Sequence, residues 1–345
     1  MVALQKDGKI IVAGVADQKR GDIALVRMKG EEKQIIRTDL GGKEQVYGLV
    51  LQPDQKIVIT GHSEKKGKKE IFVVRYTPEG VLDASFGGKG VVQIKLEESA
   101  EAHYMAIRKD GKIVVAGFSE NQNLNRMILL TLKPTGELER IVQTHFSQRD
   151  KAYGVALQPD GKIVAAGSVL DPITGEDCAV VRFFSDGRLD KSFGVQGLAR
   201  IAVGPGQDVC SCVKIQPDGK IIAGGFSTQE KRQTDFLLAR LLPNGKPDAT
   251  LNGKGWVTTD FARGFDLIHA IAFAKNGTIL AAGEASGRWA LLQYHNFLPP
   301  EITTYEKGSA EEMTVQANGD ILLTGFLKKR LGLLQIQNHL DFSKQ

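Results

Sequence analysis

Short apolar runs alternate with glycine-containing turns along the whole chain. The clearest unit is residues 157–167, LQPDGKIVAAG, in which an apolar run, a Pro-Asp-Gly-Lys turn and a second apolar run follow one another. Seven units end in this way at a glycine, namely Gly14, Gly61, Gly117, Gly167, Gly225, Gly283 and Gly325. These glycines lie 42 to 58 residues apart, and a period of this size indicates a repeat architecture.

Residues 150–203 show which strands one repeat predicts. Residues 152–157, 163–167 and 178–184 are apolar runs, and residues 198–202 form a shorter fourth run. The turn at residues 159–161 joins the first two runs, because proline presets φ and glycine accepts the positive φ of a hairpin turn. A second turn follows the third run at residues 185–187. Each repeat is therefore predicted to be a four-stranded antiparallel meander.

The inner strands are apolar at nearly every position rather than at alternate positions, as in residues 113–116 and 128–130. Such runs predict sheets that are covered on both faces. Radial stacking of the repeats meets this need, whereas a β-solenoid, the alternative, has shorter repeats and lacks regular Asp-Gly hairpins. We predict an all-β, seven-bladed β-propeller with four-stranded antiparallel blades, one domain over residues 1–345. The predicted blades span residues 1–43, 44–99, 100–149, 150–207, 208–265, 266–308 and 309–345.

The two ends of the chain suggest how the ring closes. Leu4 matches Leu157 of the type repeat, so the chain enters inside the first strand of blade 1, and we expect the natural chain to begin upstream of Met1. Residues 333–336 match a third strand, and residues 340–342 are a candidate short fourth strand. This phase predicts a whole last blade packed against a whole first blade, with little exchange of strands.

Composition excludes several classes of protein. The 45 Lys and Arg exceed the 40 Asp and Glu by only five and are interspersed with them, which does not predict nucleic-acid binding. No apolar stretch approaches the ~20 residues of a membrane span, and no signal peptide is visible. We expect a monomer. We interpret Cys178, Cys210 and Cys212 as small buried residues without a disulfide or zinc role, because Cys210 and Cys212 would share one face of a strand.

The later elements of the repeat carry their own motifs. Residues 177–183 read DCAVVRF and residues 235–241 read DFLLARL, while residues 82–90 read LDASFGGKG and residues 189–197 read LDKSFGVQG. Together with the LQPDGK hairpin, this order resembles the bacterial delta-60 tandem-repeat family over essentially the whole chain. The last motif is blurred at residues 247–253, and repeats 1, 3, 6 and 7 depart from it. The resemblance implies a bacterial, often secreted or cell-surface, propeller-like repeat protein without a catalytic motif.

Two positions in the third strand, five residues apart, differ between repeats. Four repeats have an acid and then an arginine, and three have an arginine and then a neutral residue. The first set is Asp22/Arg27, Glu70/Arg75, Asp177/Arg182 and Asp235/Arg240; the second is Arg126/Thr131, Arg288/Gln293 and Arg330/Gln335. We expect the arginines of the first set to be buried and hydrogen-bonded between blades, because a buried charge without a partner is unfavourable.

The arginines of the second set all open third strands at one rim of the predicted propeller. With two neighbouring lysines they form the basic rim, defined as Arg126, Arg288, Arg330, Lys328 and Lys329. A basic rim attracts acidic partners, and the alternative interpretation is an ordinary solvated surface, since Glu120 and Glu284 lie in the same loops.

One position near the start of each innermost strand varies in residue type, although a scaffold position should repeat one type. By analogy with other propellers, this position lies where the central channel opens. The channel-mouth ring is Tyr47, His103, Tyr153, Ser211, His269 and Glu311, and Asp150, Asp208 and Asp266 lie just outside it. The ring is a candidate site for a small polar ligand; polar residues lining a wet channel are the alternative.

No sequence motif defines an enzyme. The chain contains no Walker loop, no G-x-S-x-G and no H-E-x-x-H, and we predict no metal and no cofactor. The favoured function is a non-catalytic propeller that presents loops and a channel mouth to a protein, glycan or small polar ligand. The alternatives are a hydrolase or lyase at the channel mouth, with His103, His269, Glu311, Asp208 or Asp266 as acid–base groups, and a structural spacer in a longer repeat array.

Overall fold

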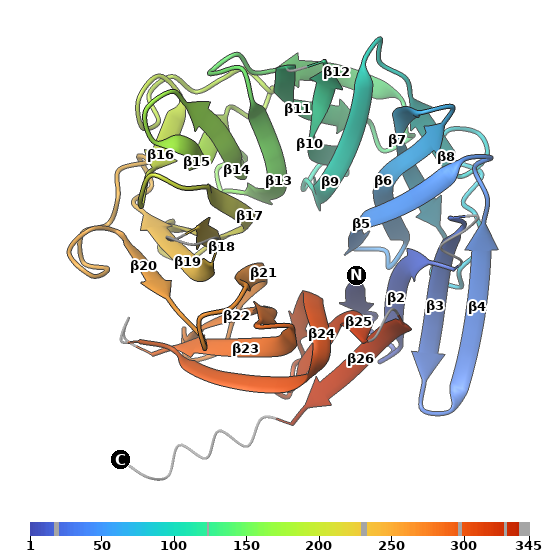
Figure 1. The fold of residues 1–345 in the computed structure, drawn as a ribbon. Helices are drawn as coiled ribbons and strands as arrows, with labels where there is room; N and C mark the ends of the chain where they lie inside the picture. Colours follow the sequence, from blue (N-terminus) through green and yellow to red (C-terminus); the bar gives the residue numbers. More distant parts are fainter. Residues whose placement is uncertain (17–20, 123, 229–232, 296–298, 328–329, 338–345) are drawn as a thin grey trace.

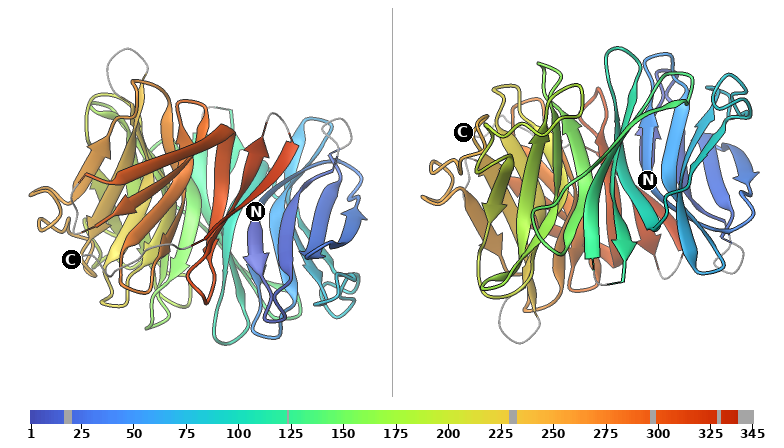
Figure 2. Two further views of the ribbon diagram at one scale, coloured as in Figure 1. Left: turned by 90° about the horizontal axis from the view of Figure 1, so that it is seen from below. Right: turned by 90° about the horizontal axis from the view of Figure 1, so that it is seen from above.

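The computed structural model describes residues 1–16, 21–122, 124–228, 233–295, 299–327 and 330–337, and these form a ring of antiparallel sheets around a central axis (Figure 1). The views from above and below show the strands running across the thickness of the ring (Figure 2). Sheets 1 to 3 consist of β1 (Val2–Leu4), β2 (Ile10–Val15), β3 (Ile23–Lys29) and β4 (Glu32–Thr38); β5 (Lys43–Leu51), β6 (Ile57–Lys65), β7 (Lys68–Tyr76) and β8 (Val91–Ile94); and β9 (Ser99–Ile107), β10 (Ile113–Asn121), β11 (Leu124–Leu132) and β12 (Leu138–Gln143).

Three further sheets complete the ring. Sheets 4 and 5 consist of β13 (Asp150–Leu157), β14 (Ile163–Asp171), β15 (Gly175–Phe183) and β16 (Leu198–Ile201), and of β17 (Asp208–Ile215), β18 (Ile221–Thr228), β19 (Thr234–Leu241) and β20 (Trp256–Thr259). Sheet 6 consists of β21 (Asp266–Phe273), β22 (Ile279–Ala285), β23 (Arg288–Tyr294), β24 (Glu301–Val315), β25 (Ile321–Leu327) and β26 (Arg330–Ile336). The fold is an all-β, six-bladed β-propeller.

The prediction of seven blades is therefore wrong, and the reason lies in β24. This strand is 15 residues long and has two partners: its first half pairs with β23, and its second half, from Gly308 to Val315, pairs with β25. No loop separates the outer strand of the sixth repeat from the inner strand of the seventh. Five sheets have four strands as expected, and the last two repeats share one sheet of six.

The predicted Asp-Gly hairpins join the two innermost strands of each repeat. In the type repeat, the Gly161 amide donates to the Gln158 carbonyl at 2.9 Å, and Gly161 has φ of 84°. Asp160 accepts from the Lys162 amide at 3.0 Å, which closes the turn. Gln55, which replaces the glycine in sheet 2, adopts φ of 69°, so it holds the same turn in a strained left-handed conformation.

Both faces of the inner strands are buried, as the continuous apolar runs predict. On sheet 4, Val164 and Val180 pack against sheet 5, in one cluster with Ala223 and Leu237. The next residues along the strands face the other way, and Val181 packs against Met127 of sheet 3. Each fully buried valine or leucine contributes roughly 1.5–3 kcal/mol relative to an exposed one, so contact between neighbouring sheets is the main source of stability.

Buried arginines tie neighbouring sheets together through the LDxSFG motif. Arg75 donates to Asp83 at 2.8 Å and, at 2.6 Å, to the carbonyl of Pro134 in the turn that joins β11 to β12 of sheet 3. Arg182 repeats this arrangement with Asp190 and with the carbonyl of Pro243 in sheet 5. The expectation of buried arginines hydrogen-bonded between blades is confirmed for these two residues.

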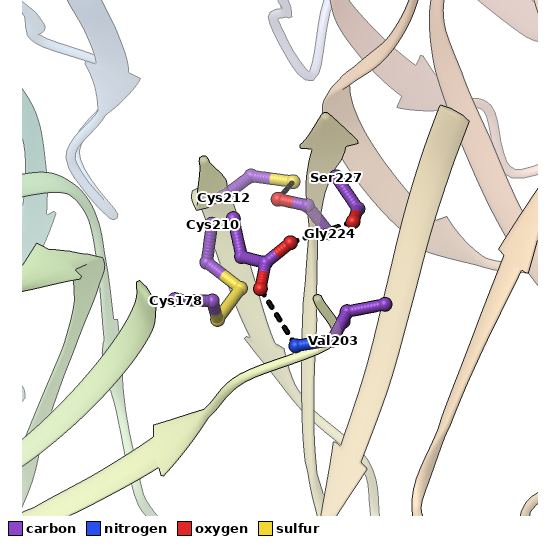
Figure 3. Close-up of a disulfide and its surroundings, with 7 residues drawn as sticks. Cys178, Val203, Cys210, Cys212, Gly224 and Ser227 are labelled. Atoms are coloured by element: carbon purple, nitrogen blue, oxygen red, sulfur yellow. Dashed lines mark hydrogen bonds between the residues drawn. A yellow bond between two sulfur atoms is a disulfide. The ribbon is translucent and has the colours of Figure 1, made fainter. Parts of the chain in front are cut away.

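A disulfide between Cys178 of β15 and Cys210 of β17 joins sheets 4 and 5 (Figure 3). Our interpretation of all three cysteines as unpaired is therefore wrong. Cys210 and Cys212 do not share a face, because the strand bulges at Ser211 between them. Cys210 packs between sheets 4 and 5, whereas Cys212 packs on the side of sheet 6, near the Gly224 carbonyl. Cys212 is the free cysteine.

The ring closes by packing of β24 and β25 against β1, which belongs to a separate sheet (Figure 1). The candidate fourth strand at residues 340–342 lies outside the described residues. Within the described part of the chain, no helix is long and apolar enough to cross a membrane.

Candidate functional site

Every residue of the channel-mouth ring is the extra residue of a β-bulge. The innermost strands of sheets 2 to 5 each bulge once against their neighbour, and β21 and β24 of sheet 6 do the same. The bulged residues are Tyr47, His103, Tyr153, Ser211, His269 and Glu311. A bulge leaves one residue out of the strand pairing and re-aims its side chain. This backbone device, repeated around the ring, turns six side chains toward the channel.

The glycine that closes six of the seven hairpin units, all except Gly14, makes this bulge possible. A Cβ on Gly167 would lie 1.8 Å from the carbonyl oxygen of Lys151, and one on Gly225 would lie 1.8 Å from that of Val209. The same close approach occurs at Gly61, Gly117, Gly283 and Gly325, at 1.8 to 2.0 Å. The recurring glycine of the sequence is therefore part of the site, because its lack of a Cβ leaves room for the carbonyl that the bulge displaces.

The six bulged side chains line one cavity of about 480 Å³. Lys151, Glu176 and Gln207 add polar groups to its wall, and Phe226 and Val209 add apolar ones. This volume lies in the range of pockets for small ligands. The predicted ring is thus a real constellation: the fold brings together residues that are 264 positions apart in the chain, from Tyr47 to Glu311.

One wall of the cavity is aromatic. The rings of Tyr47 and His103 stack with centroids 4.5 Å apart, and Tyr153 meets His103 edge-on at 5.0 Å. Phe118 lies on the other side of His103 at 5.4 Å. Burial raises the pKa of Tyr47 to about 12 and raises that of Tyr153 as well, so both phenols stay neutral near pH 7.

A buried carboxylate lies behind this wall, between two histidines. The Oε2 atom of Glu101 is 3.4 Å from Nε2 of His103 and 3.5 Å from Nδ1 of His62, and Oε1 accepts from Lys69 Nζ at 2.5 Å. Burial alone would raise the pKa of Glu101, but the facing His103, the Lys69 ammonium and His62 lower it to about 2. Burial lowers the pKa of His62 to about 4, so this imidazole is neutral near pH 7.

Both histidine nitrogens that face Glu101 are buried and lack a partner in hydrogen-bond geometry within the described residues. Such a carboxylate–histidine contact is the arrangement that orients a general base. Sequence reasoning missed Glu101 and His62. Aligning the repeats could have identified Glu101, because this position differs in residue type between repeats. In the other repeats it is occupied by Gln45, Lys151, Val209, Leu267 and Ser309.

The opposite wall is more polar. His269 Nδ1 lies 3.6 Å from Glu311 Oε2, and both side chains are partly exposed to the cavity. Ser211 lines the same side. Deeper in the channel, the Tyr104 hydroxyl donates to Glu312 at 3.3 Å. Burial raises the pKa of Glu312, and its charge is the first cause that raises the pKa of Tyr104.

The three aspartates beside the ring are structural rather than acid–base groups of the cavity. Asp150, Asp208 and Asp266 are each fully buried at the first residue of an innermost strand, and none lines the cavity. Asp208, for example, accepts from the Val203 amide and the Ser227 hydroxyl, each at 2.6 Å. Burial raises the pKa of Asp266 to about 6.

The basic rim is only partly described. Arg126 is the third residue of β11 and Arg288 is the first residue of β23, and Arg126 donates to the Ser147 carbonyl at 3.2 Å. Arg288 is exposed. Arg330 begins β26, and Lys328 and Lys329 lie outside the described residues. The rim's role in binding stays a prediction.

Comparison with known proteins supports the fold and three of the repeats. Residues 52–86, 158–193 and 216–251 match the profile of the "Domain of unknown function (DUF5122) beta-propeller". The chain therefore carries DUF5122 beta-propeller repeats. No curated protein matches it.

Solved structures with this architecture differ widely in what they do. The WD40 β-propeller domain of Doa1 is 13% identical, with a TM-score of 0.61, over 98% of this chain and 92% of that one. A catalytically inactive histidine-to-alanine variant of virginiamycin B lyase from Staphylococcus aureus, with quinupristin, is 13% identical, with a TM-score of 0.54, over 88% and 87%. A streptogramin B lyase is 13% identical, with a TM-score of 0.56, over 97% of this chain and 92% of that one. At this identity the likeness shows the fold alone.

Proposed function

We propose that this chain is a binding protein of the bacterial delta-60 repeat type whose channel mouth takes a small polar ligand. The observation that carries the proposal is the convergence of six bulged residues on one cavity. A scaffold needs the bulge and the glycine behind it, but it does not need Tyr47, Tyr153 or His269 at the bulge. The repeats hold the bulged backbone constant and vary the side chain that enters the channel, as expected when rigid elements position a binding site.

A sugar unit, free or at the end of a glycan, is the ligand class that the lining fits best. The aromatic wall of Tyr47, His103 and Tyr153 suits the apolar face of a sugar ring. Ser211, His269 and Glu311 supply hydrogen-bond donors and acceptors for hydroxyl groups on the other side. The disulfide between Cys178 and Cys210 favours an oxidising compartment, so we propose a secreted or cell-surface location.

Ligand titrations test this proposal. We expect a mono- or oligosaccharide to bind in calorimetry and ligand-observed NMR, with inorganic phosphate and a nucleotide as comparison probes. Ser211→Phe should fill the cavity and weaken binding more than about 10-fold, because the bulge directs residue 211 into it. Ser185→Phe, in an exposed turn at the other end of sheet 4, is the matched control and should bind normally. Binding that survives Ser211→Phe contradicts the proposed site.

A second candidate function is acid–base catalysis, a hydrolase or lyase activity at the same cavity. It rests on Glu101, which is ionised, buried and in contact with His103 from one side and His62 from the other. In this reading, His103 acts as general base toward a ligand in the cavity, and Glu101 orients it. The lyases among the solved propellers are consistent with such chemistry on this fold, without assigning it to this chain.

Turnover assays on esters, cyclic peptides and uronic acid glycans separate the two candidates. If the chain is an enzyme, we expect His103→Ala to reduce turnover by about 10²–10⁴-fold, the usual contribution of a general base. His145→Ala, an exposed histidine in the loop before sheet 4, is the control and should keep full turnover. Binding of a ligand without turnover of any of these substrates by the unmodified protein favours the binding function.

A further inference from the structure

Four of the innermost strands carry an acid three residues before the bulge. This position is Glu44 in β5, Asp150 in β13, Asp208 in β17 and Asp266 in β21. All four side chains are fully buried at the junction with the preceding sheet. A buried carboxylate needs a partner for each oxygen, because an unsatisfied charged group is costly to bury. The four junctions can therefore be compared, oxygen by oxygen.

At three junctions the protein itself supplies these partners. Asp150 accepts at Oδ1 from the Ser147 amide and at Oδ2 from the Phe146 amide, at 2.9 and 2.8 Å. Asp208 accepts at Oδ1 from the Ser227 hydroxyl and at Oδ2 from the Val203 amide. Asp266 accepts at Oδ1 from Ser286 and at Oδ2 from Phe261. The acid at this position normally acts as a cap for the loop that enters the strand.

Glu44 departs from this rule. Its Oε1 accepts from the Ser63 hydroxyl at 2.8 Å and from the Gly42 amide at 3.1 Å. Its Oε2 is buried and has no hydrogen-bond partner within the described residues. One oxygen of a fully buried carboxylate thus accepts no hydrogen bond of good geometry from the described residues.

Two more carboxylates lie beside Glu44, as Asp235 and Asp260 lie near Asp266 at the junction of sheets 5 and 6. Asp22, just before β3, and Asp39, just after β4, each place a carboxylate oxygen within 4.8 Å of the other and of a Glu44 oxygen. No ion pair reaches any of the three from the described residues. The contrast with sheet 4 is direct, because there Arg200 pairs with Asp171 and lies 3.4 Å from Asp177. Lys65, near the same junction, donates to the Leu40 carbonyl at 2.6 Å.

We propose that Asp22, Asp39 and Glu44 bind a divalent cation, and that the cation is calcium. Calcium prefers carboxylate oxygens at about 2.3–2.6 Å, so ligands on opposite sides of one ion lie up to about 5 Å apart, which the triad satisfies. Magnesium requires about 2.0–2.1 Å and near-ideal octahedral geometry. The exposed Asp39 leaves room for water ligands to complete the shell.

The ion would cross-link sheets 1 and 2. Asp22 and Asp39 flank the outer hairpin of sheet 1, while Glu44 belongs to the innermost strand of sheet 2. A cation at this junction would satisfy the second oxygen of the buried acid, which hydrogen bonds from the protein satisfy at the other three junctions. This inference is independent of the ligand at the channel mouth.

Calcium titration of the EDTA-treated protein tests the site. We expect calcium chloride to raise the midpoint of thermal unfolding progressively with concentration, with a dissociation constant between about 10⁻⁷ and 10⁻³ M, and magnesium chloride to act only at much higher concentration. Asp39→Asn should weaken calcium binding at least about 10-fold in calorimetry. Because Asp39 is exposed, this variant should fold even if Glu44→Gln does not.

Asp260→Asn is the matched control, since Asp260 precedes the acid of β21 much as Asp39 precedes Glu44. It should leave calcium affinity unchanged. The proposal is overturned if calcium at about 10 mM, above the expected range of dissociation constants, leaves the midpoint of thermal unfolding equal to that of the EDTA-treated protein. It is also overturned if Asp39→Asn binds calcium with the affinity of the unmodified protein. A loss of affinity in Asp260→Asn instead would move the ion to the junction of sheets 5 and 6 and also overturn it.

Discussion

Replacing Gly167 with alanine should abolish the stable propeller. The new Cβ would lie 1.8 Å from the Lys151 carbonyl oxygen, 2.7 Å from its carbon and 2.9 Å from the Cα of Ala152. All three are backbone atoms, so no side-chain rotation relieves the overlap, and β13 must separate from β14. We expect a loss of more than about 4 kcal/mol in the free energy of unfolding, measured by urea denaturation, or failure to fold.

Gly204→Ala is the control for this substitution. Gly204 lies in the loop before β17, and a Cβ there meets nothing within 4 Å. Its effect should fall between neutral and about 1 kcal/mol stabilising, because alanine restricts the unfolded chain. If Gly167→Ala instead unfolds at the same urea concentration as Gly204→Ala, the bulge at Tyr153 is not formed as described, and the account of the channel mouth fails with it.

The glycine also shows why so much of the fold could be predicted. Each repeat carries the same turn, the same apolar runs and the same closing glycine, so a single unit could be interpreted seven times. The number of sheets could not be predicted, because strand boundaries in residues 301–315 depend on the partners of β24. Gly308 is the only glycine there, and it marks the point where the partner changes from β23 to β25.

Site residues could be predicted where one aligned position of the repeats differs in residue type from repeat to repeat. They could not be predicted where the site depends on contact between two different aligned positions. Tyr47, His103 and Tyr153 stood out because a position that should be constant differs. Glu101 and His62 lie in other columns, and their contact depends on the stacking of sheets 2 and 3. The disulfide was missed for a similar reason, since a bulge at Ser211 reverses the face of Cys212 relative to Cys210.

Arg182→Ala should also strongly destabilise the propeller, although less than Gly167→Ala. Arg182 donates through Nε to Asp190 at 2.9 Å and through Nη1 to the Pro243 carbonyl of the next sheet, and its guanidinium carbon lies 4.6 Å from the centre of the Phe193 ring. The side chains of Arg182 and Asp190 are only 9% and 1% exposed. Removing one member leaves a buried carboxylate without its charge partner, which costs about 3–5 kcal/mol.

The loss of stability in Arg182→Ala should depend on pH in a defined direction. Burial alone would raise the pKa of Asp190, but hydrogen bonds from Ser192 and the charge of Arg182 hold it below its usual value. That pair therefore stabilises the fold above the ordinary pKa of aspartate, and the contribution is lost as the pH falls through the lowered pKa. Without Arg182, burial should raise the pKa of Asp190, so the deficit of Arg182→Ala should shrink as the pH is lowered from 7 towards 5.

The turn that follows β15, the strand of Arg182, supplies the control. Arg188 and Asp186 form an ion pair of similar length, 2.7 Å, but their side chains are 70% and 46% exposed. Solvent screens such a pair, so Arg188→Ala should change the free energy of unfolding by no more than about 0.5 kcal/mol and with little dependence on pH. Equal urea midpoints for Arg182→Ala and Arg188→Ala would mean that the arginine of the third strand does not tie sheet 4 to sheet 5. A large but pH-independent loss in Arg182→Ala would assign its role to packing on Phe193 rather than to its charge.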